Sequence, residues 1–460
     1  MLQNLFKQIR FAPQGSAPSL EDFEQAHQTP APSSIRINSK KYPHSIASLK
    51  PVPWCPQGYY LEQRPVFTLD PLLHAGAYYV QEAGSMLSGF VFDQFFPNKE
   101  NLTVLDLCAA PGGKSTHIAD LIGESSLLIS NEVIQSRAQI LAENASKWGS
   151  MNQWITQCDP KILGQLDSFF DCILIDAPCT GSGLWRRDAK TMEEWSVDAV
   201  KLCSERQQRI IADIAPSIKS QGYIIYSTCS YSREENEDMV DWMCTQLGWE
   251  AREIKVSEEW NIEQSKSQLG NPGYRCAPWR TASEGFFIAV LQAPEKEQKS
   301  IKNKKTTPSL LQKNAQTLLQ NWIKIPTLFI EKNENWYGIP KVLGDRYNTL
   351  LQHQIGIKKT GVAMGKTIKN ELLPDEELAL CIHLQNQFPN YEVNQEEALQ
   401  FLRKEELKLT MKAKGWHLVS YQGLGLGWGK WLGNRMNNYY PKNWRIRMQG
   451  NESSTIISAH

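Results

Sequence analysis

Short apolar runs alternate with longer amphipathic segments through the middle of the chain. The runs have the length and composition of buried parallel strands and cover residues 104–107, 126–133, 154–160, 172–175 and 223–226. Helical spacing of apolar residues marks segments between them, at residues 137–149 and about 191–218. Strands that alternate with helices predict a doubly wound α/β sheet, which we assign to residues 99–292.

A glycine-rich turn follows the first predicted strand, and residues 108–115 read CAAPGGKS. Gly112 and Gly113 allow the backbone to approach a ligand closely, and a helix predicted to begin near Ser115 offers free N–H groups. A strand, a tight turn and a helix N-terminus form the ligand crevice of such a sheet. A P-loop would need glycine at the position of Cys108, so a nucleotide hydrolase is disfavoured.

Two acidic residues follow this turn. Glu132 stands at the end of the second strand, about twenty residues after the glycines, where this fold places a carboxylate on ribose hydroxyls. We therefore predict Glu132 as a ribose ligand. Asp159, near the end of the third predicted strand, is only a turn residue when the sequence alone is considered.

Two cysteines lie just past the ends of the last two predicted strands, in Asp176-Ala-Pro-Cys179 and Ser227-Thr-Cys229. The carboxyl ends of parallel strands share one edge of a sheet, so we expect both thiols beside the glycine turn. A buried free cysteine is usually inert filling, but two cysteines in matching loops favour chemistry.

Residues 104–115, 174–183 and 225–236 closely resemble the motifs of the Sun-type RNA cytosine-5 methyltransferases. The resemblance implies a Rossmann-like catalytic domain that binds S-adenosyl-L-methionine. The cofactor residues that it implies are Cys108, Ala109, Ala110, Pro111, Gly112, Gly113, Lys114, Glu132, Asp159 at the adenine, and Asp176. Related enzymes often carry an acidic residue where Ser182 stands, which leaves the role of that turn open.

The same resemblance implies covalent catalysis on cytosine. A thiolate adds to C6, and C5 then becomes nucleophilic enough to take a methyl group. Cys229 is implied as this nucleophile, Cys179 as the residue that assists release, and Asp176 as the group that holds the cytosine edge. DNA enzymes attack with the cysteine of the Pro-Cys motif, so the sequence alone leaves the two cysteine roles interchangeable.

The charge of the chain is unevenly distributed. The formal net charge is 0, but it is −9 over residues 1–300 and +9 over residues 301–460. A charged, apolar-poor segment at 293–309 predicts a linker between the catalytic domain and a C-terminal region, 310–460. The positive C-terminal region is therefore expected to contact a polyanion.

Further features point to RNA. The tail places cations beside Trp428, Trp431, Tyr439, Tyr440 and Trp444, a mixture typical of RNA-binding surfaces. Residues 361–380 resemble part of a PUA-type RNA-binding module, and residues 1–98 resemble the N-terminal RNA-binding module of the family. Arg186 and Arg187 are predicted phosphate contacts.

The resemblance implies 16S rRNA or the small ribosomal subunit as the partner. A transfer RNA is the alternative substrate, and a non-catalytic ribosome-assembly factor with a relic cofactor fold is the alternative from another class. Intact cysteines in both motifs disfavour that factor.

The ten cysteines form no C-x-x-C pair, so neither a disulfide framework nor a metal site is predicted. The N-terminus lacks an apolar signal core, and no run approaches the ~18 apolar residues that span a membrane. These features predict a cytoplasmic protein with no membrane or metal partner.

Overall fold

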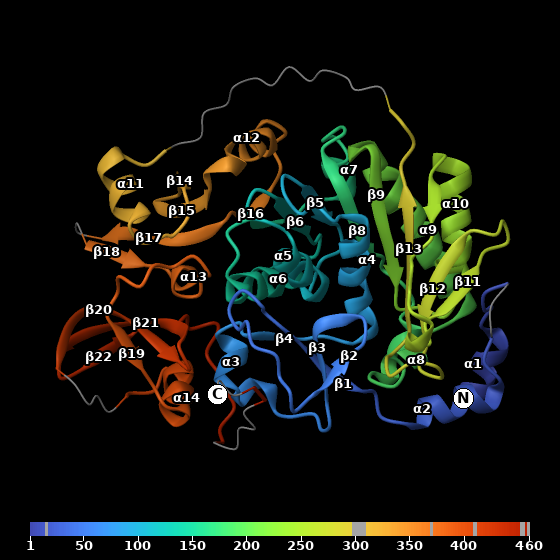
Figure 1. Cartoon of the computed structure of the whole chain (residues 1–460), viewed down its shortest axis with the longest axis horizontal. Coiled ribbons are helices and arrows are strands. Elements are labelled where there is room, and N and C mark those ends of the chain that lie inside the picture. The colour runs from blue at the N-terminus through green and yellow to red at the C-terminus, as the bar shows by residue number, and fades with distance from the viewer. Residues whose placement is uncertain (14–16, 297–309, 369–370, 408–411, 451–455, 458–460) are drawn as a thin grey trace.

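The five predicted strands lie in the middle of one ten-stranded sheet (Figure 1). Its strand order is β11-β12-β13-β9-β8-β5-β6-β7-β16, with β10 beside β13. The computed structural model describes the 460-residue chain except residues 14–16, 297–309, 369–370, 408–411, 451–455 and 458–460. The parallel strands are β5 (Thr103–Asp106), β6 (Leu127–Asn131), β7 (Gln153–Thr156), β8 (Phe170–Asp176) and β9 (Ile218–Thr228). The predicted α/β sheet is confirmed.

Antiparallel strands extend this sheet on both sides. On one side they are β10 (Glu250–Arg252), β11 (Glu263–Lys266), β12 (Pro272–Cys276) and β13 (Phe286–Gln292). On the other side, β16 (Ile357–Lys359) pairs with β7.

Helices cover both faces because alternate strand residues point to opposite sides. Leu105 and Ile173 pack with the helices α7 (Pro160–Leu163), α9 (Val197–Ile214) and α10 (Glu237–Leu247). Val104 and Leu174 pack on the other face, with α4 (Leu87–Phe95) and α5 (Gly113–Leu121). Helix α6 (Gln135–Trp148) adjoins α5 on that face.

The long helix predicted at 191–218 is divided. It forms α8 (Ala189–Glu194) and then α9. The break occurs at Ser196, whose side chain accepts a hydrogen bond from Ala199 N at 3.1 Å and so caps a new helix.

The N-terminal module joins two parts of the molecule. Its helices α1 (Leu2–Gln8) and α2 (Leu20–Gln28) pack at one end, against Trp185 and Tyr231. Its four-stranded sheet has the order β2-β3-β1-β4 and comprises β1 (Ser33–Ile37), β2 (Lys50–Val52), β3 (Cys55–Leu61) and β4 (Tyr78–Val80), with α3 (Pro71–His74) before β4. Arg36 of β1 is buried and donates through Nη2 to Thr116 Oγ1 of α5 at 2.7 Å, which fixes the module to the central domain.

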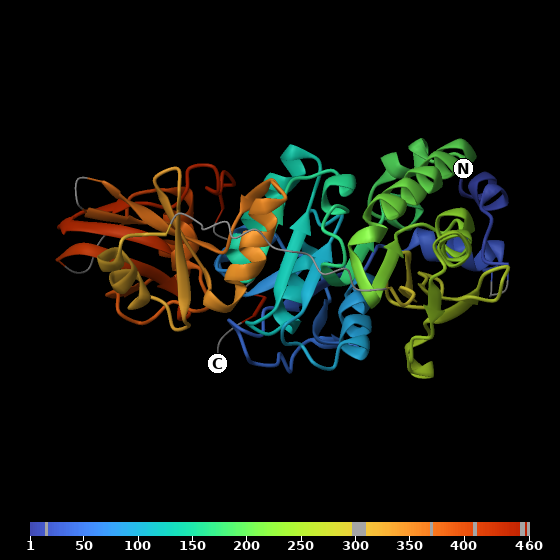
Figure 2. The ribbon, with the colours of Figure 1, turned by 90° about the horizontal axis from the view of Figure 1, so that it is seen from above.

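Two small sheets lie at the other end of the molecule (Figures 1 and 2). The first has the order β14-β15-β17-β18 and comprises β14 (Thr327–Lys332), β15 (Asn335–Pro340), β17 (Val362–Ile368) and β18 (Glu371–Pro374), flanked by α11 (Lys313–Gln320) and α13 (Glu376–Ala379). The second comprises β19 (Asn390–Glu392), β20 (Ala413–Tyr421), β21 (Leu424–Gly433) and β22 (Met436–Asn438), with α14 (Gln395–Arg403).

Part of the C-terminal region belongs physically to the central domain. Helix α12 (Gly344–Gln352) packs on it through Tyr347, whose ring lies edge-on to Trp154 at 5.8 Å. Arg346 donates to Asn101 O at 2.7 Å. Together with β16, these contacts place residues 344–359 on the catalytic sheet. The domain boundaries stay predictions, and residues 297–309 of the predicted linker lie outside the described residues.

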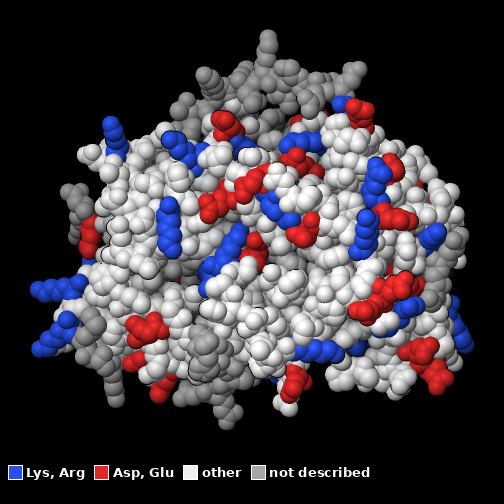
Figure 3. All heavy atoms as spheres, in the orientation of Figure 1, with Lys and Arg blue, Asp and Glu red and all other residues white. Residues whose placement is uncertain are grey.

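The expectation that the tail aromatics share a surface role is wrong for three of the five. Trp431 and Tyr440 are buried under α14 and the N-terminal module. Trp428 is buried against the first small sheet with α11 and α13. Tyr439 is 38% exposed and remains available to a ligand. On the face drawn in Figure 3, acidic and basic side chains are interspersed rather than separated.

Within the described ranges, no helix is long and apolar enough to cross a membrane. The same residues hold no group of three His, Cys, Asp or Glu side chains able to bind a metal ion.

Candidate active site

The backbone of the turn between β5 and α5 is not covered by a side chain at Gly112. Gly112 has φ +118° and is the N-cap of α5, a conformation that side chains rarely adopt. A Cβ atom there would also come within 3.2 Å of Leu141 Cδ1 on α6. The same helix holds the turn, because Asn144 Nδ2 donates to Pro111 O at 2.8 Å. The turn is thus fixed and open to close approach by a ligand.

Two adjoining cavities open beside this turn. The larger, of about 590 Å³, is lined by Cys108, Ala110, Glu132, Asp159, Asp176, Cys179 and Cys229 among others. The smaller, of about 150 Å³, shares Cys108, Ala110 and Asp176 with it and adds Asp106, Ala109, Pro111, Gly113 and Lys114. Of the predicted cofactor and catalytic residues, Gly112 alone lines neither of these two cavities. Its contribution is the shape of the turn.

The predicted nucleoside ligands, Glu132 and Asp159, both line the larger cavity. Glu132 is buried, and its carboxylate accepts Ile134 N at 2.9 Å and lies 3.2 Å from Arg137 Nη1. Asp159 is exposed and caps α7, since Lys161 N donates to Oδ1 at 3.0 Å. Each carboxylate keeps acceptor capacity for a further donor.

The two predicted catalytic cysteines meet at the edge of the sheet. Cys179 Sγ and Cys229 Sγ are 3.2 Å apart, although fifty residues separate them in the chain. The hydrogen bond with Cys229, and then burial, raise the pKa of the Cys179 thiol well above its ordinary value. Cys179 is therefore held as the neutral thiol.

Charged groups concentrate in the smaller cavity. Lys114 Nζ lies 2.8 Å from Asp176 Oδ2. Burial alone would lower the pKa of Lys114, but the Asp176 carboxylate raises it above its ordinary value. Asp106 accepts Ser115 Oγ at 2.5 Å, and burial raises the pKa of Asp106 to about 7. Asp106 Oδ1 has no partner among the described residues.

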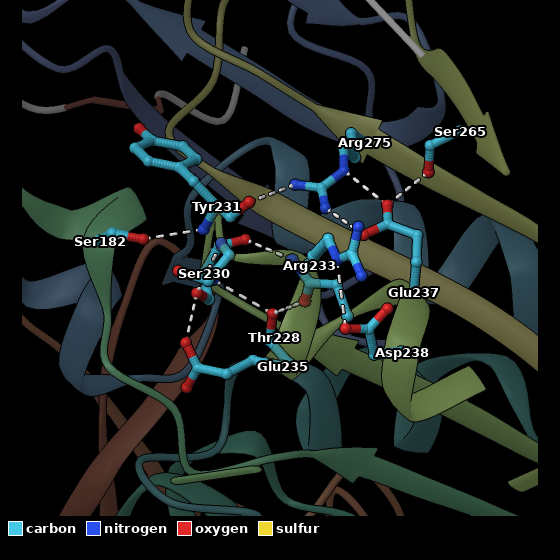
Figure 4. Close-up of polar contacts among 12 residues, drawn as sticks. Ser182, Thr228, Ser230, Tyr231, Arg233, Glu235, Glu237, Asp238, Ser265 and Arg275 are labelled. Carbon is cyan, nitrogen blue, oxygen red and sulfur yellow. Dashed lines mark hydrogen bonds and ion pairs between the residues drawn. The ribbon is translucent and has the colours of Figure 1, made fainter. Parts of the chain in front are cut away.

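Buried contacts brace the loop that follows β9 (Figure 4). Arg275 donates through Nε to Glu237 Oε1 at 2.8 Å and through Nη1 to Tyr231 O at 3.1 Å. Ser182 Oγ accepts Tyr231 N at 2.8 Å, which ties the loop after β8 to the loop after β9. This contact gives Ser182 a structural role that the sequence left open.

Arg186 and Arg187, which the sequence favoured as phosphate contacts, do not line the larger cavity. Arg186 Nη2 donates to Ser283 O, and Arg187 Nη2 lies 2.7 Å from Glu284 Oε1. Both are thus already engaged within the protein.

Sequence reasoning missed Arg206 and Arg209 as cavity residues. Both are exposed and line the larger cavity, and neither guanidinium pairs with a described side chain. Their i, i+3 spacing on an amphipathic helix was the available signal, because it places them on one face.

Family comparisons agree with this arrangement. The model described as 16S rRNA methyltransferase RsmB/F matches residues 94–292. The models for the N-terminal domain and the PUA domain of RsmF match residues 11–83 and 388–446. The PUA match covers the second C-terminal sheet, so residues 361–380, which resembled such a module, precede it.

Individual relatives match along almost the whole chain. The ribosomal RNA small subunit methyltransferase F of Shewanella halifaxensis is 30% identical over 92% of this chain and 94% of its own length. The chain belongs to the ribosomal RNA small subunit methyltransferase F family. The predicted resemblance to the Sun-type family is confirmed, and the relatives assign the chain to the F type within it.

Other comparisons with F-family proteins and methyltransferases agree. The same-named protein of Shewanella sediminis is 29% identical over 95% of both chains. A solved methyltransferase homologue from Pyrococcus horikoshii is 27% identical, with a TM-score of 0.52, over 63% of this chain and 93% of that one. This F-family chain is therefore a methyltransferase.

Proposed function

We propose that this protein transfers a methyl group from S-adenosyl-L-methionine to C5 of one cytidine of 16S rRNA in the cytoplasm, through a bond between Cys229 Sγ and C6. The observation that carries the proposal is the meeting of two thiols, 3.2 Å apart, in the cavity that also holds Glu132 and Asp159. One cavity thus contains both a candidate nucleophile and candidate ligands for a nucleoside.

The cavity residues fit the proposed cofactor. Glu132 can accept from the ribose hydroxyls, Asp159 can accept from the adenine amine, and the Gly112 turn admits close backbone approach. Asp106 Oδ1, which has no described partner, suits the ammonium group of the methionine end. S-adenosyl-L-methionine supplies an electrophilic methyl group when it is bound.

The chemistry needs a thiolate, a charge acceptor and a base. Cys229 attacks C6, which moves electron density to C5 and toward N3, and C5 then takes the methyl group. Asp176 accepts from the cytosine amino group, while the Lys114 ammonium beside it balances negative charge on the ring. Loss of the C5 proton to a base lets the Cys229 thiolate leave.

We assign Cys229 as the nucleophile and Cys179 as its neighbour in the same cavity. The two sulfur atoms are 3.2 Å apart, so the Cys179 thiol can donate a hydrogen bond to the attacking sulfur. Cys179 is then positioned to assist release of the methylated product. This assignment of roles follows the family resemblance, and variants of the two cysteines test it.

The RNA partner is supported by the relatives and by exposed cations. The matching relatives are named as ribosomal RNA small subunit methyltransferases, and residues 388–446 match a PUA domain. Arg206 and Arg209 line the proposed target cavity. We infer that 16S rRNA, alone or within the small subunit, is the substrate, with transfer RNA as the alternative.

Bisulfite sequencing of RNA from cells lacking the protein tests the proposal. One 16S cytidine should lose its resistance to bisulfite, and the wild-type protein but not Cys229→Ala should restore it. A change confined to transfer RNA would favour the alternative substrate. Rescue by Cys229→Ala would instead support a non-catalytic assembly factor.

A further inference from the structure

One buried carboxylate is bonded to the residues that directly follow both cysteines. Glu235 Oε1 accepts Thr180 N at 2.8 Å, and Oε2 accepts Thr180 Oγ1 at 2.6 Å. Oε2 also accepts Ser230 Oγ at 2.5 Å. Thr180 follows Cys179, and Ser230 follows Cys229. The Glu235 side chain therefore bridges the two cysteine loops.

Glu235 is itself held in place. The residue is fully buried, and its carbonyl oxygen accepts the Tyr226 hydroxyl at 2.6 Å. Figure 4 shows its carboxylate reaching Ser230, while the neighbouring Glu237 turns toward Arg275 and Ser265. The contacts of Glu235 are thus distinct from the buried ion pair of the next turn.

Hydrogen bonds to a carboxylate in a desolvated site are short and strong, so they fix the groups that donate them. The two cysteine loops leave adjacent strands, β8 and β9, and two bonds of 2.8 Å also join them, from Tyr231 N to Ser182 Oγ and from Gly183 N to Cys229 O. The Glu235 carboxylate adds bonds to the residue directly after each cysteine, so it restrains the loops where the thiols are attached.

We propose that Glu235 is a positioning residue that sets the separation of Cys179 and Cys229, so that both thiols reach one pyrimidine ring. The inference rests on the proposed function for its purpose, but the separation of the thiols can be measured without any methylation. Glu235 does not touch either sulfur. It acts through Thr180 and Ser230.

The experiment uses the full chain with Glu235→Ala and Glu235→Gln. The rate of disulfide formation between Cys179 and Cys229 under the thiol oxidant diamide is followed by peptide mass spectrometry. Single-turnover methylation of 16S rRNA and calorimetry with S-adenosyl-L-methionine complete the set. Glu235→Ala should slow cross-linking and lower the methylation rate by about 100-fold, the cost of a misplacement near 1 Å, with cofactor affinity retained.

The glutamine variant should recover part of both rates, because its carbonyl oxygen can still accept Thr180 N. Ser230→Ala removes one of the three bonds and should slow cross-linking less, which keeps the test available if Glu235→Ala does not fold. Asp70→Ala is the matched control. Asp70 is buried in the N-terminal module and likewise accepts a backbone N–H, from Leu72, and a hydroxyl, from Tyr78.

Unchanged cross-linking in both Glu235 variants would overturn the inference. Equal slowing in Asp70→Ala would also overturn it, because general loss of stability would then explain the effect. If the wild-type protein forms the disulfide rapidly but never methylates RNA, the proposed function is wrong. The positioning role of Glu235 is then still tested by the cross-linking rates of its variants.

Discussion

Lys114 Nζ and Asp176 Oδ2 lie 2.8 Å apart at the boundary between the two cavities. The lysine of the GGKST sequence is thus paired with the carboxylate proposed to hold the cytosine. In a P-loop the same lysine would be free to contact a phosphate. We therefore propose that Lys114 acts beside the target base, although the resemblance implied a cofactor role for it.

We predict that cofactor binding tolerates the loss of Lys114 better than the loss of Glu132. Glu132→Ala leaves ribose hydroxyls unpaired and should cost about 1–3 kcal/mol of binding free energy. A bulky residue at Gly112 should also weaken binding, because φ there is +118°. Calorimetry with S-adenosyl-L-methionine and with ATP measures this. Tight ATP binding that disappears in Lys114→Ala would contradict the assignment.

We predict that replacing Cys179 and replacing Cys229 have different effects on methylation. Cys229→Ala removes the nucleophile, so methyl transfer should fall to background and no adduct should form. Cys179→Ala should still attack and methylate but release slowly, so a covalent complex with methylated RNA should persist through denaturing electrophoresis. This complex should require the cofactor and vanish in the double variant. Normal turnover by Cys179→Ala, or an adduct found only with Cys229→Ala, would reverse the roles.

Cofactor affinity should depend on pH through Asp106. Burial raises the pKa of Asp106 to about 7, so the carboxyl is protonated below that pH and ionised above it. A cationic ammonium group prefers the ionised form, and binding below pH 7 must first displace the proton. Affinity should therefore fall as pH drops from 7, by at most about tenfold per pH unit. Calorimetry on wild type and Asp106→Asn checks this, and an equally steep profile in the asparagine variant would refute it.

Arg206 and Arg209 should contribute to RNA affinity. Replacing both with glutamine should weaken binding and reduce the slope of log affinity against log salt by about 0.7 per lost phosphate contact on a single strand. Lys201→Gln is the control, since Lys201 is exposed on α9 but does not line the larger cavity. Filter-binding titrations at several salt concentrations measure the slopes. Equal effects of the two changes would indicate only a general charge effect.

The sequence predicted the strands of the catalytic domain well because their apolar runs are local signals. The positions of Cys179 and Cys229 then followed from strand ends. The contacts of Arg186 and Arg187 could not be predicted in this way, because their partners, Ser283 and Glu284, lie about a hundred residues later in the chain. Trp428 and Trp431 resembled surface aromatics because their burial depends on other modules that pack over them.

Strand β16 could not be predicted from the sequence either. Ile357-Lys358-Lys359 has no apolar run, and its partner β7 lies about two hundred residues earlier. The expectation that residues 310–460 form a separate RNA-binding region therefore needs a qualification. A truncation at residue 310 removes Arg346 and β16 from the catalytic sheet along with the PUA match. It should lower the melting temperature as well as RNA affinity.

The late position of β16 in the chain has a consequence for synthesis. A ribosome that has made every cofactor and cysteine motif, up to residue 292, has not yet delivered the strand that closes the β7 edge of the sheet. That edge keeps unpaired backbone groups, which favour association with other chains, until about residue 360 has left the exit tunnel. The nascent chain thus contains all the cofactor and cysteine motifs before its central sheet is complete. Its tendency to aggregate through the β7 edge should end only when β16 emerges from the ribosome.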